Sequence, residues 1–303
     1  MDQFDQLFDQ LQKCCPGMEL LKQEPMARHT TFRIGGPVPL MARPTNEEQV
    51  LACVRLAREN QIPLVVLGNG SNLLVADEGV QAFVLDMTGL SRLERTGERE
   101  ITVGAGVTLA RLASFAAGEG LTGLEFAGGI PGTLGGAVMM NAGAYGGEMV
   151  QVVRRTRCLT PEGTVKEIIG EEHDFSYRHS VFSQGEDVIL SSVLELEPGQ
   201  EEDIRAQMAE LAQKRKSKQP LEYPSAGSMF KRPQGYFAAA LIDQCGLKGF
   251  TVGGAQVSEK HAGFVINRGG ATCADVLALV REVQRRVREQ TGVELEMEVR
   301  RLG

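Results

Sequence analysis

The sequence has no excess of positive charge. Among its 303 residues, 39 acidic side chains outnumber 32 basic ones and give a formal net charge of −7. The charges are mixed along the chain, without the basic patch or stripe that binding to a phosphate backbone requires. Nucleic acid is therefore not expected as a partner.

Long apolar runs are also missing. The N-terminus reads MDQFDQLFDQ, which is acidic and lacks the apolar core of a signal peptide. No uninterrupted apolar run reaches the roughly 20 residues of a membrane helix. We therefore expect a cytoplasmic protein that does not insert into membranes.

Patterns typical of metal sites and disulfide frameworks are absent as well. The six cysteines include one adjacent pair, but no CxxC and no regular spacing with histidine; they are Cys14, Cys15, Cys53, Cys158, Cys245 and Cys273. We expect reduced thiols and no bound metal.

Hydrophobic patterning predicts an α+β fold with more than one core. Short apolar runs bounded by turn residues fill residues 30–196 and are typical of strands: PLVVLG, SNLLVA, AFVLDM, ITVGAG and DVILSSVLELE. Apolar spacing of three and four residues predicts helices at 4–11, 46–60, 108–119, 201–216, 239–245 and 272–291, with AGFVIN as a strand before the last of them. We predict an N-terminal helical segment at 1–28, a domain at 29–196 and a smaller domain at 197–303.

The C-terminal residues 293–300 alternate apolar and charged side chains, which predicts a final strand. Glu294, Glu296 and Glu298 would then share one side, with neighbours about 6–7 Å apart. Like charges at that spacing raise a carboxyl pKa. Each carboxylate taken alone fits a solvated face equally well or better.

Two glycine-rich segments carry the strongest functional signal. In residues 66–74, glycines between two predicted strands allow successive backbone N–H groups to converge on an anion, although an ordinary hairpin turn fits the same letters. In residues 123–147, each glycine would cost a helix about 1 kcal/mol relative to alanine. We predict mostly irregular backbone there, wrapped around a ligand, because the interleaved large apolar residues are foreign to flexible linkers.

Two common nucleotide motifs are not satisfied. The segment VGAGVTL at 103–109 follows a strand and opens a helix, but Leu109 stands where the dinucleotide fingerprint requires its third glycine. No P-loop motif occurs. Neither a Rossmann site nor a P-loop is expected.

Seven sequence blocks resemble the UDP-N-acetylenolpyruvoylglucosamine reductase family. Three lie in the first half: HTTFRIGGP (29–37), LGNGSN (67–72) and the segment from GIPGTLGG to NAGAYG (129–146). Four follow in the family's order: YRHS (177–180), PSAGSMFK (224–231), LIDQCGLKG (241–249) and LEMEVR (295–300). The resemblance covers essentially the whole chain beyond the N-terminal helix.

This resemblance implies a fold and an activity. The fold is an FAD-binding domain of the p-cresol methylhydroxylase/vanillyl-alcohol oxidase type, followed by a smaller α+β substrate-binding domain. The activity is NADPH-dependent reduction of the enolpyruvyl ether of UDP-N-acetylglucosamine to UDP-N-acetylmuramate, a step in peptidoglycan precursor synthesis. Residues 195–218 leave room for little beyond one helix, so the insertion that carries a substrate-clamping tyrosine in one branch is missing. The chain resembles the shorter, second type.

The resemblance also implies roles for individual residues. Arg178 is the cation near the substrate carboxylate, Glu298 orients that carboxylate, and Ser228 is the proton donor. Tyr177, Lys218, Lys231, His261 and Arg300 are predicted substrate contacts, although Lys218 and Lys231 taken alone would fit surface lysines. His261 is also a rival proton donor, since histidine titrates near neutrality. The implied FAD contacts are Arg33, Gly68, Asn69, Gly70, Ser71, Asn72, Gly129, Ile130, Pro131, Gly132, Thr133, Gly135, Gly136, Ala137, Asn141, Gly143 and Ala144.

Some alternatives stay open at this point. Arg178 alone would fit a surface arginine, and Ser228 alone would fit a helix cap. Arg232 stands where the family commonly has asparagine, so that nucleotide contact does not carry over. A related flavoprotein oxidase or dehydrogenase, or a non-catalytic flavin- or nucleotide-sugar-binding module, would share the glycine segments.

Overall fold

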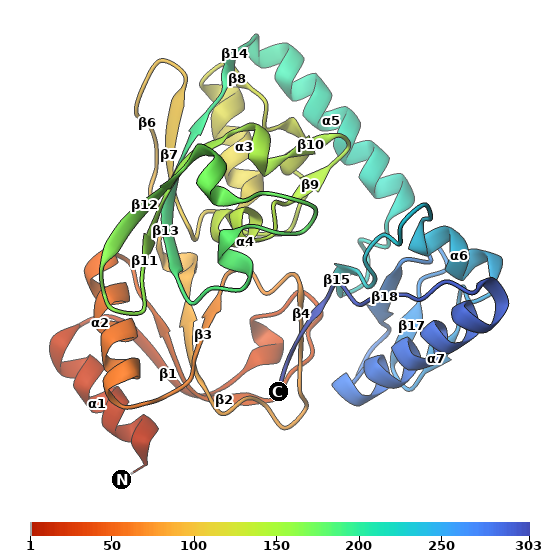
Figure 1. Cartoon of the computed structure of the whole chain (residues 1–303), viewed down its shortest axis with the longest axis horizontal. Coiled ribbons are helices and arrows are strands. Elements are labelled where there is room, and N and C mark those ends of the chain that lie inside the picture. The colour runs from red at the N-terminus through yellow and green to blue at the C-terminus, as the bar shows by residue number, and fades with distance from the viewer. Residues whose placement is uncertain (1) are drawn as a thin grey trace. The chain divides into compact units, whose positions relative to one another are not determined.

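A computed structural model describes residues 2–303 of the chain, which divide into two compact units (Figure 1). Unit 1 comprises the residues up to Lys22 together with 39–69 and 82–214, and unit 2 comprises 23–38, 70–81 and 215–303. Each unit is assembled from separate stretches of sequence, whereas the partition at residues 28 and 196 is continuous. The division of the chain into 1–28, 29–196 and 197–303 therefore stays a prediction.

Unit 1 is built around two sheets. The first has the order β1(Glu19–Pro25)-β2(Pro37–Arg43)-β5(Phe83–Asp86)-β3(Leu64–Leu67), with β2 and β3 both parallel to β5. The second is antiparallel, in the order β12(Val165–Ile169)-β11(Val153–Leu159)-β13(Val188–Glu195)-β7(Glu100–Gly104)-β6(Leu93–Arg95). Four of the predicted strands are confirmed as β3, β5, β7 and β13.

Two helices of unit 1 begin at residues whose side chains cap them. Asn46 accepts a hydrogen bond from the Gln49 N–H at the start of α2(Glu47–Glu59), and Thr108 accepts one from the Arg111 N–H at the start of α3(Leu109–Gly118). The N-terminal helix α1(Gln3–Cys14) buries Phe4, Leu7 and Leu11 and contacts α2 (Figure 1). A fourth predicted helix is confirmed as α5(Glu201–Lys218).

Unit 2 combines a four-stranded antiparallel sheet and a separate two-stranded sheet with two α-helices. The antiparallel sheet has the order β15(Ser225–Ser228)-β18(Phe264–Asn267)-β17(Ala255–Val257)-β16(Thr251–Val252). Helix α7(Cys273–Thr291) contacts β16 and β17, and α6(Ala238–Gln244) contacts α7 (Figure 1). Gly292 ends α7 with φ of 75°, in the left-handed region that glycine adopts without strain. These elements confirm the predicted helices and the AGFVIN strand.

The C-terminal strand prediction is only partly right. Residues 293–299 do not form a strand, and their one ladder contact is the isolated bridge between Met297 and Phe230. The true strand is β19(Arg300–Leu302), which pairs in parallel with β4(Leu73–Val75). The alternation of apolar and charged side chains predicts which face is buried, and Leu295 and Val299 are buried. The alternation does not specify which segment accepts and donates the backbone hydrogen bonds.

The glycine-rich residues 123–147 are less irregular than predicted. They include the short helix α4(Leu134–Met139) and the strand pair β9(Gly143–Ala144) and β10(Gly147–Glu148). Gly135 lies inside α4 because the helix approaches Ala105 closely, where an added Cβ would be 3.2 Å from the Ala105 Cβ. Close packing therefore overrides the low helix propensity of glycine at this position.

No helix in residues 2–303 combines the length and the apolar character needed to cross a bilayer.

Candidate functional site

The first glycine-rich loop, residues 68–72, connects strands of two different sheets. It leaves β3, which pairs with β5, and enters β4, which pairs with β19. The alternative of an ordinary hairpin turn is therefore wrong. Within residues 2–303, no backbone N–H of residues 68–72 donates a hydrogen bond to a backbone carbonyl. These amides are available to an anionic group.

The two glycine-rich segments meet within unit 1. Asn69 Nδ2 donates a 2.7 Å hydrogen bond to the Pro131 carbonyl oxygen. A Cβ on Gly68 would lie only 2.3 Å from Thr133 Oγ1, so this approach requires glycine. The N–H groups of Gly129, Gly132, Thr133 and Gly136 also donate to no backbone carbonyl among residues 2–303. The segments thus bring unused amides together, as a phosphate-bearing cofactor requires.

Other predicted FAD positions differ in what they offer a ligand. The Ala137 methyl group is buried in the core, and its backbone N–H and carbonyl oxygen already bond to Thr133 and Ala142. Gly143 is required by packing, since a Cβ there would lie 2.6 Å from the Glu148 Cγ. Ile130 packs against the core of unit 1, and Ala144 pairs with Gly147. Arg33 is exposed, with its backbone in the left-handed region at φ of 56°.

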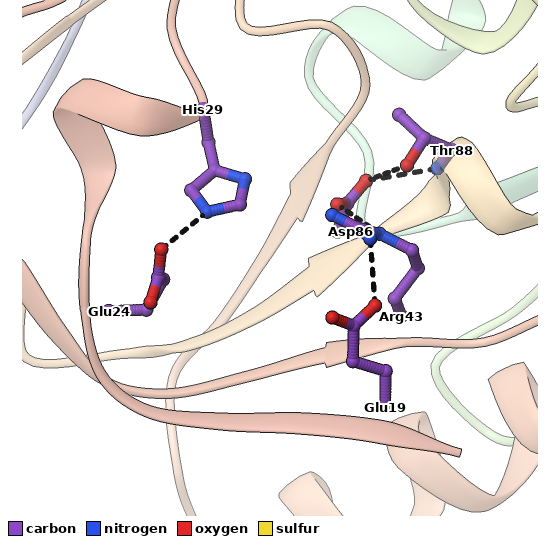
Figure 2. A network of polar contacts seen from close by, with 6 residues as sticks. All are labelled: Glu19, Glu24, His29, Arg43, Asp86 and Thr88. Carbon is purple, nitrogen blue, oxygen red and sulfur yellow. Dashed lines mark hydrogen bonds and ion pairs between the residues drawn. The ribbon is translucent and has the colours of Figure 1, made fainter. Parts of the chain in front are cut away.

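A buried carboxylate stands beside the first glycine loop. Asp86 pairs with Leu67 in the parallel register of β3 and β5, directly before Gly68. Figure 2 shows its carboxylate accepting hydrogen bonds from Arg43 Nε at 2.8 Å and from the Thr88 hydroxyl at 2.7 Å. Asp86 is 2% exposed, so these bonds replace the water that its charge would otherwise require. Sequence reasoning did not predict this support of the loop.

In unit 2, the blocks around residues 30 and 70 lie together. The Thr31 N–H donates to the Gly70 carbonyl oxygen at 3.3 Å, and a Cβ on Gly70 would lie 2.0 Å from the His29 carbonyl oxygen. The Thr31 hydroxyl donates to the Ser225 carbonyl oxygen at 2.7 Å. His29 Nε2 also lies 3.0 Å from Glu24 Oε1 (Figure 2). The structure thus joins the first two family blocks to the strand that ends in Ser228.

Ser228 and Glu298 lie on adjacent segments of unit 2. Ser228 is the last residue of β15 and pairs with Phe264 in β18. The Glu298 N–H donates to the carbonyl oxygen of Met229 at 2.9 Å, and Asn72 Nδ2 donates to the Glu298 carbonyl oxygen at 3.2 Å. Because Ser228 ends a strand, the helix-cap alternative is wrong. Glu298 is half-buried, whereas Glu294 and Glu296 are exposed, which distinguishes it from the other two carboxylates.

Arg178 occupies a tight turn in unit 1. The Ser176 and His179 backbones exchange hydrogen bonds of 3.1 and 3.2 Å across it. Arg178 is half-buried and has φ of 56°, a left-handed conformation that costs a non-glycine residue roughly 1 kcal/mol. Its guanidinium carbon lies 5.5 Å from the ring centroid of the exposed Tyr177. Strain of this kind persists where the surroundings hold it, often at functional sites.

The remaining predicted substrate contacts differ in environment. Burial lowers the pKa of His261, whose Nδ1 accepts a 3.2 Å hydrogen bond from the Gly263 N–H, so the ring is neutral at pH 7. A neutral imidazole is a weaker proton donor than an imidazolium. Lys231 pairs with Glu296, whereas Lys218 ends α5 and Arg300 begins β19, both exposed. No group of three or more potential metal ligands gathers within residues 2–303.

Comparison with known proteins identifies both halves of the chain. Residues 38–169 match the family described as FAD binding domain, and residues 219–302 match UDP-N-acetylenolpyruvoylglucosamine reductase, C-terminal domain. The UDP-N-acetylenolpyruvoylglucosamine reductase of Agathobacter rectalis is 49% identical, with 95% of each chain covered. That of Geobacillus kaustophilus is 45% identical, with 100% of this chain and 99% of the relative covered.

Solved structures agree with these matches. The UDP-N-acetylenolpyruvylglucosamine reductase of Thermus caldophilus superposes with a TM-score of 0.80 at 37% identity, covering 94% of this chain and 99% of that one. An alkyldihydroxyacetonephosphate synthase, at 20% identity and a TM-score of 0.52, shares the fold over 65% of this chain and 44% of its own. The predicted fold, an FAD-binding domain of the p-cresol methylhydroxylase/vanillyl-alcohol oxidase type followed by a smaller α+β domain, is confirmed. With relatives this similar over nearly its whole length, the chain belongs to the UDP-N-acetylenolpyruvoylglucosamine reductase family.

Proposed function

We propose that this protein is an FAD-dependent oxidoreductase that uses NADPH to reduce the enolpyruvyl ether of UDP-N-acetylglucosamine to UDP-N-acetylmuramate, in peptidoglycan precursor synthesis. Family membership and the FAD binding domain match support this assignment. The structural observation that carries it is the meeting of Asn69 with Pro131 in unit 1, with unused amides on both segments. Because the reaction consumes NADPH and a nucleotide sugar, we propose the cytoplasm as its location.

The residues present fit FAD. When bound, FAD accepts a hydride from NADPH and passes it to C3 of the enolpyruvyl group. We propose that the main chain of residues 68–72 and 129–137 binds the anionic and polar parts of the cofactor, since glycines there allow close approach. Arg33, Gly143, Ala144 and the main chain of Asn141 complete the proposed set, since the Asn141 side chain is engaged within the protein.

Three side chains act on the substrate in this proposal. Addition of hydride to C3 builds negative charge toward the substrate carboxylate, and Arg178 stabilises that charge through a planar guanidinium suited to bidentate binding. Glu298 orients the carboxylate, and Ser228 delivers the proton to C2. Burial lowers the pKa of His261, which removes the advantage that a charged imidazolium would have over Ser228 as the donor.

Contacts to the rest of the substrate are assigned by matching the charge of each side chain to a charged or neutral part of the substrate. Lys218, Lys231 and Arg300 are proposed to bind its diphosphate or carboxylate, and Tyr177 and His261 its neutral parts. Lys231 would exchange its partner Glu296 for the substrate on binding. Breaking the Lys231–Glu296 pair costs little, because exposed ion pairs contribute at most about 1 kcal/mol to stability.

One spectroscopic experiment tests the function. The purified protein is expected to show the absorption spectrum of oxidised flavin, to bleach when NADPH is added without oxygen, and to recover its colour with enolpyruvyl-UDP-N-acetylglucosamine. Recovery with another small substrate, and not with this one, would identify a different oxidase or dehydrogenase of the same fold. Bound flavin that NADPH and substrate leave unchanged would identify a binding module.

A further inference from the structure

The turn that carries Arg178 is fastened on both sides to one short segment, residues 139–141. Before the turn, Asn141 Nδ2 donates to the Ser176 carbonyl oxygen at 3.2 Å. After it, the Ser180 and Ser183 hydroxyls both donate to the Met139 carbonyl oxygen at 2.8 Å. All of these residues belong to unit 1. The segment that follows α4 therefore fixes both ends of the turn.

The side chain of Asn141 is fully engaged inside the protein. It is 3% exposed, and its second amide hydrogen bond goes to Glu148 Oε2 at 3.0 Å. Its Oδ1 accepts from the Val150 N–H at 2.9 Å. Both N–H bonds of the amide are thus used, and the side chain has no donor left for a cofactor.

The position suits asparagine and few other residues. Asn141 has φ of 42°, and asparagine adopts the left-handed region more readily than other non-glycine residues. Aspartate has the same shape but would place a carboxylate against the Ser176 carbonyl oxygen and the Glu148 carboxylate. Glycine would fit the backbone but would lose all three hydrogen bonds.

The strained turn has a rigid support on its N-terminal side. His173 is fully buried, with Nδ1 2.9 Å from the Gly170 carbonyl oxygen and Nε2 2.9 Å from Thr156 Oγ1. Its ring stacks on Phe175 with centroids 4.8 Å apart. Between this support and Arg178, the Ser176 carbonyl oxygen is held by Asn141. The direction of the turn therefore depends on that amide.

We infer that Asn141 is a positioning residue for Arg178, and that its amide aims the guanidinium by holding the carbonyl oxygen of Ser176. The inference rests on the proposed function, in which Arg178 stabilises charge on the substrate. A displacement of about 1 Å at such a group costs on the order of 100-fold in rate. Asn141 acts through the turn and does not touch the reacting atoms.

Three variants separate this role from general structural support. Asn141→Asp keeps the acceptor for the Val150 N–H and removes both donors. Glu148→Gln supplies a new donor at position 148, so the double variant Asn141→Asp/Glu148→Gln restores that link without restoring the one to Ser176. Glu148→Gln alone is the matched control. If the double variant loses cooperative unfolding, Asn141→Gly carries the same test, since glycine keeps the left-handed backbone.

Two measurements are compared between the double variant and the control. Amide hydrogen exchange in flavin-free protein is expected to be faster at residues 176–179 in the double variant and unchanged elsewhere. In the flavin-loaded protein, reduction by NADPH is expected to keep its rate. Reoxidation by enolpyruvyl-UDP-N-acetylglucosamine is expected to slow by about 100-fold.

The outcomes are distinguishable. Equal reoxidation rates in the double variant and the control would overturn the inference, as would equal exchange at residues 176–179. Parallel losses in both half-reactions, together with a lower unfolding midpoint, would show a general structural role and would also overturn it. Failure of the substrate to reoxidise the wild-type protein would refute the proposed function, while the exchange data would still decide whether Asn141 holds the turn.

Discussion

Asn69 and Pro131, 62 positions apart in the sequence, are joined by a 2.7 Å hydrogen bond from the Asn69 side-chain amide to the Pro131 carbonyl oxygen. The bond fixes two stretches of backbone that each have amides without a backbone acceptor. A surface shaped in this way before binding loses less conformational entropy when a ligand arrives.

The glycine at position 136 is expected to serve the cofactor and not the fold. Gly136→Ala meets nothing closer than 3.9 Å and lies within α4, so the flavin-free protein should be as stable as the wild type or more so. FAD affinity should fall roughly tenfold, which corresponds to about 1.4 kcal/mol. Flavin titration and thermal unfolding measure the two effects. Gly118→Ala, at the end of α3 with nothing closer than 3.8 Å, is the control and should keep FAD affinity unchanged.

Arg178→Lys is expected to lower kcat by about 10²–10³-fold while FAD stays bound, because a lysine provides charge without the bidentate fork. Steady-state NADPH consumption with substrate measures the loss. Arg155→Ala removes an exposed arginine from β11 and should leave kcat at the wild-type value. Normal turnover in Arg178→Lys would show that the guanidinium geometry is dispensable.

Ser228→Ala is expected to lower kcat by about 10²–10⁴-fold, the range for loss of a positioned proton donor. Flavin reduction by NADPH should be unaffected, so rapid mixing locates the defect in the substrate half-reaction. Ser225→Ala, at the other end of β15, is the matched control. Near-normal reduction of the enolpyruvyl substrate by Ser228→Ala would move the proton donor elsewhere, with His261 the next residue to test.

Glu298→Gln and Glu294→Gln compare two carboxylates of the same C-terminal segment. Only the first is half-buried and adjacent to the Ser228 strand, whereas Glu294 is exposed. Glu298→Gln should reduce kcat by about 10²-fold or more, and Glu294→Gln should not. Equal kinetics for the two variants would mean that neither carboxylate orients the substrate.

The buried His173 predicts a pH dependence of stability. Burial lowers its pKa below the ordinary value of 6.5, so the unfolded chain binds more protons than the folded one below that pH. Its contribution is therefore complete above pH 6.5 and is lost as the pH falls toward the folded pKa. His173→Asn should flatten the decline in unfolding free energy by at most about 1.4 kcal/mol per pH unit. Denaturant unfolding between pH 7.5 and pH 5, with about equal slopes for both proteins, would contradict this reasoning.

Helices were predicted from the sequence because their signals are local. The apolar face of α1 and the caps at Asn46, Thr108 and Gly292 each involve residues within about one turn of one another. Strand pairing was not predictable in the same way. The parallel pair between residues 73–75 and 300–302 depends on a partner far along the chain, which neither segment specifies alone.

The candidate site was predicted in part. Resemblance named blocks that the structure brings together in each unit, such as 68–69 with 131–133 and 228–231 with 296–298. It did not reveal that the Asn141 amide bonds to Ser176, because hydrogen bonds between distant loops depend on three-dimensional packing. The helix α4 was missed for the same reason, since only the approach to Ala105 explains Gly135 within it.

Because β19 pairs with β4, the order of translation limits when unit 2 can complete its fold. A ribosome releases residues 73–75 long before their partner at 300–302. Every segment of unit 1 has been translated by then, so its sheets can form on the nascent chain, as domains commonly do. Unit 2 cannot form this strand pair until residues 300–302 have been translated, and a chain that stops before Arg300 would never form it.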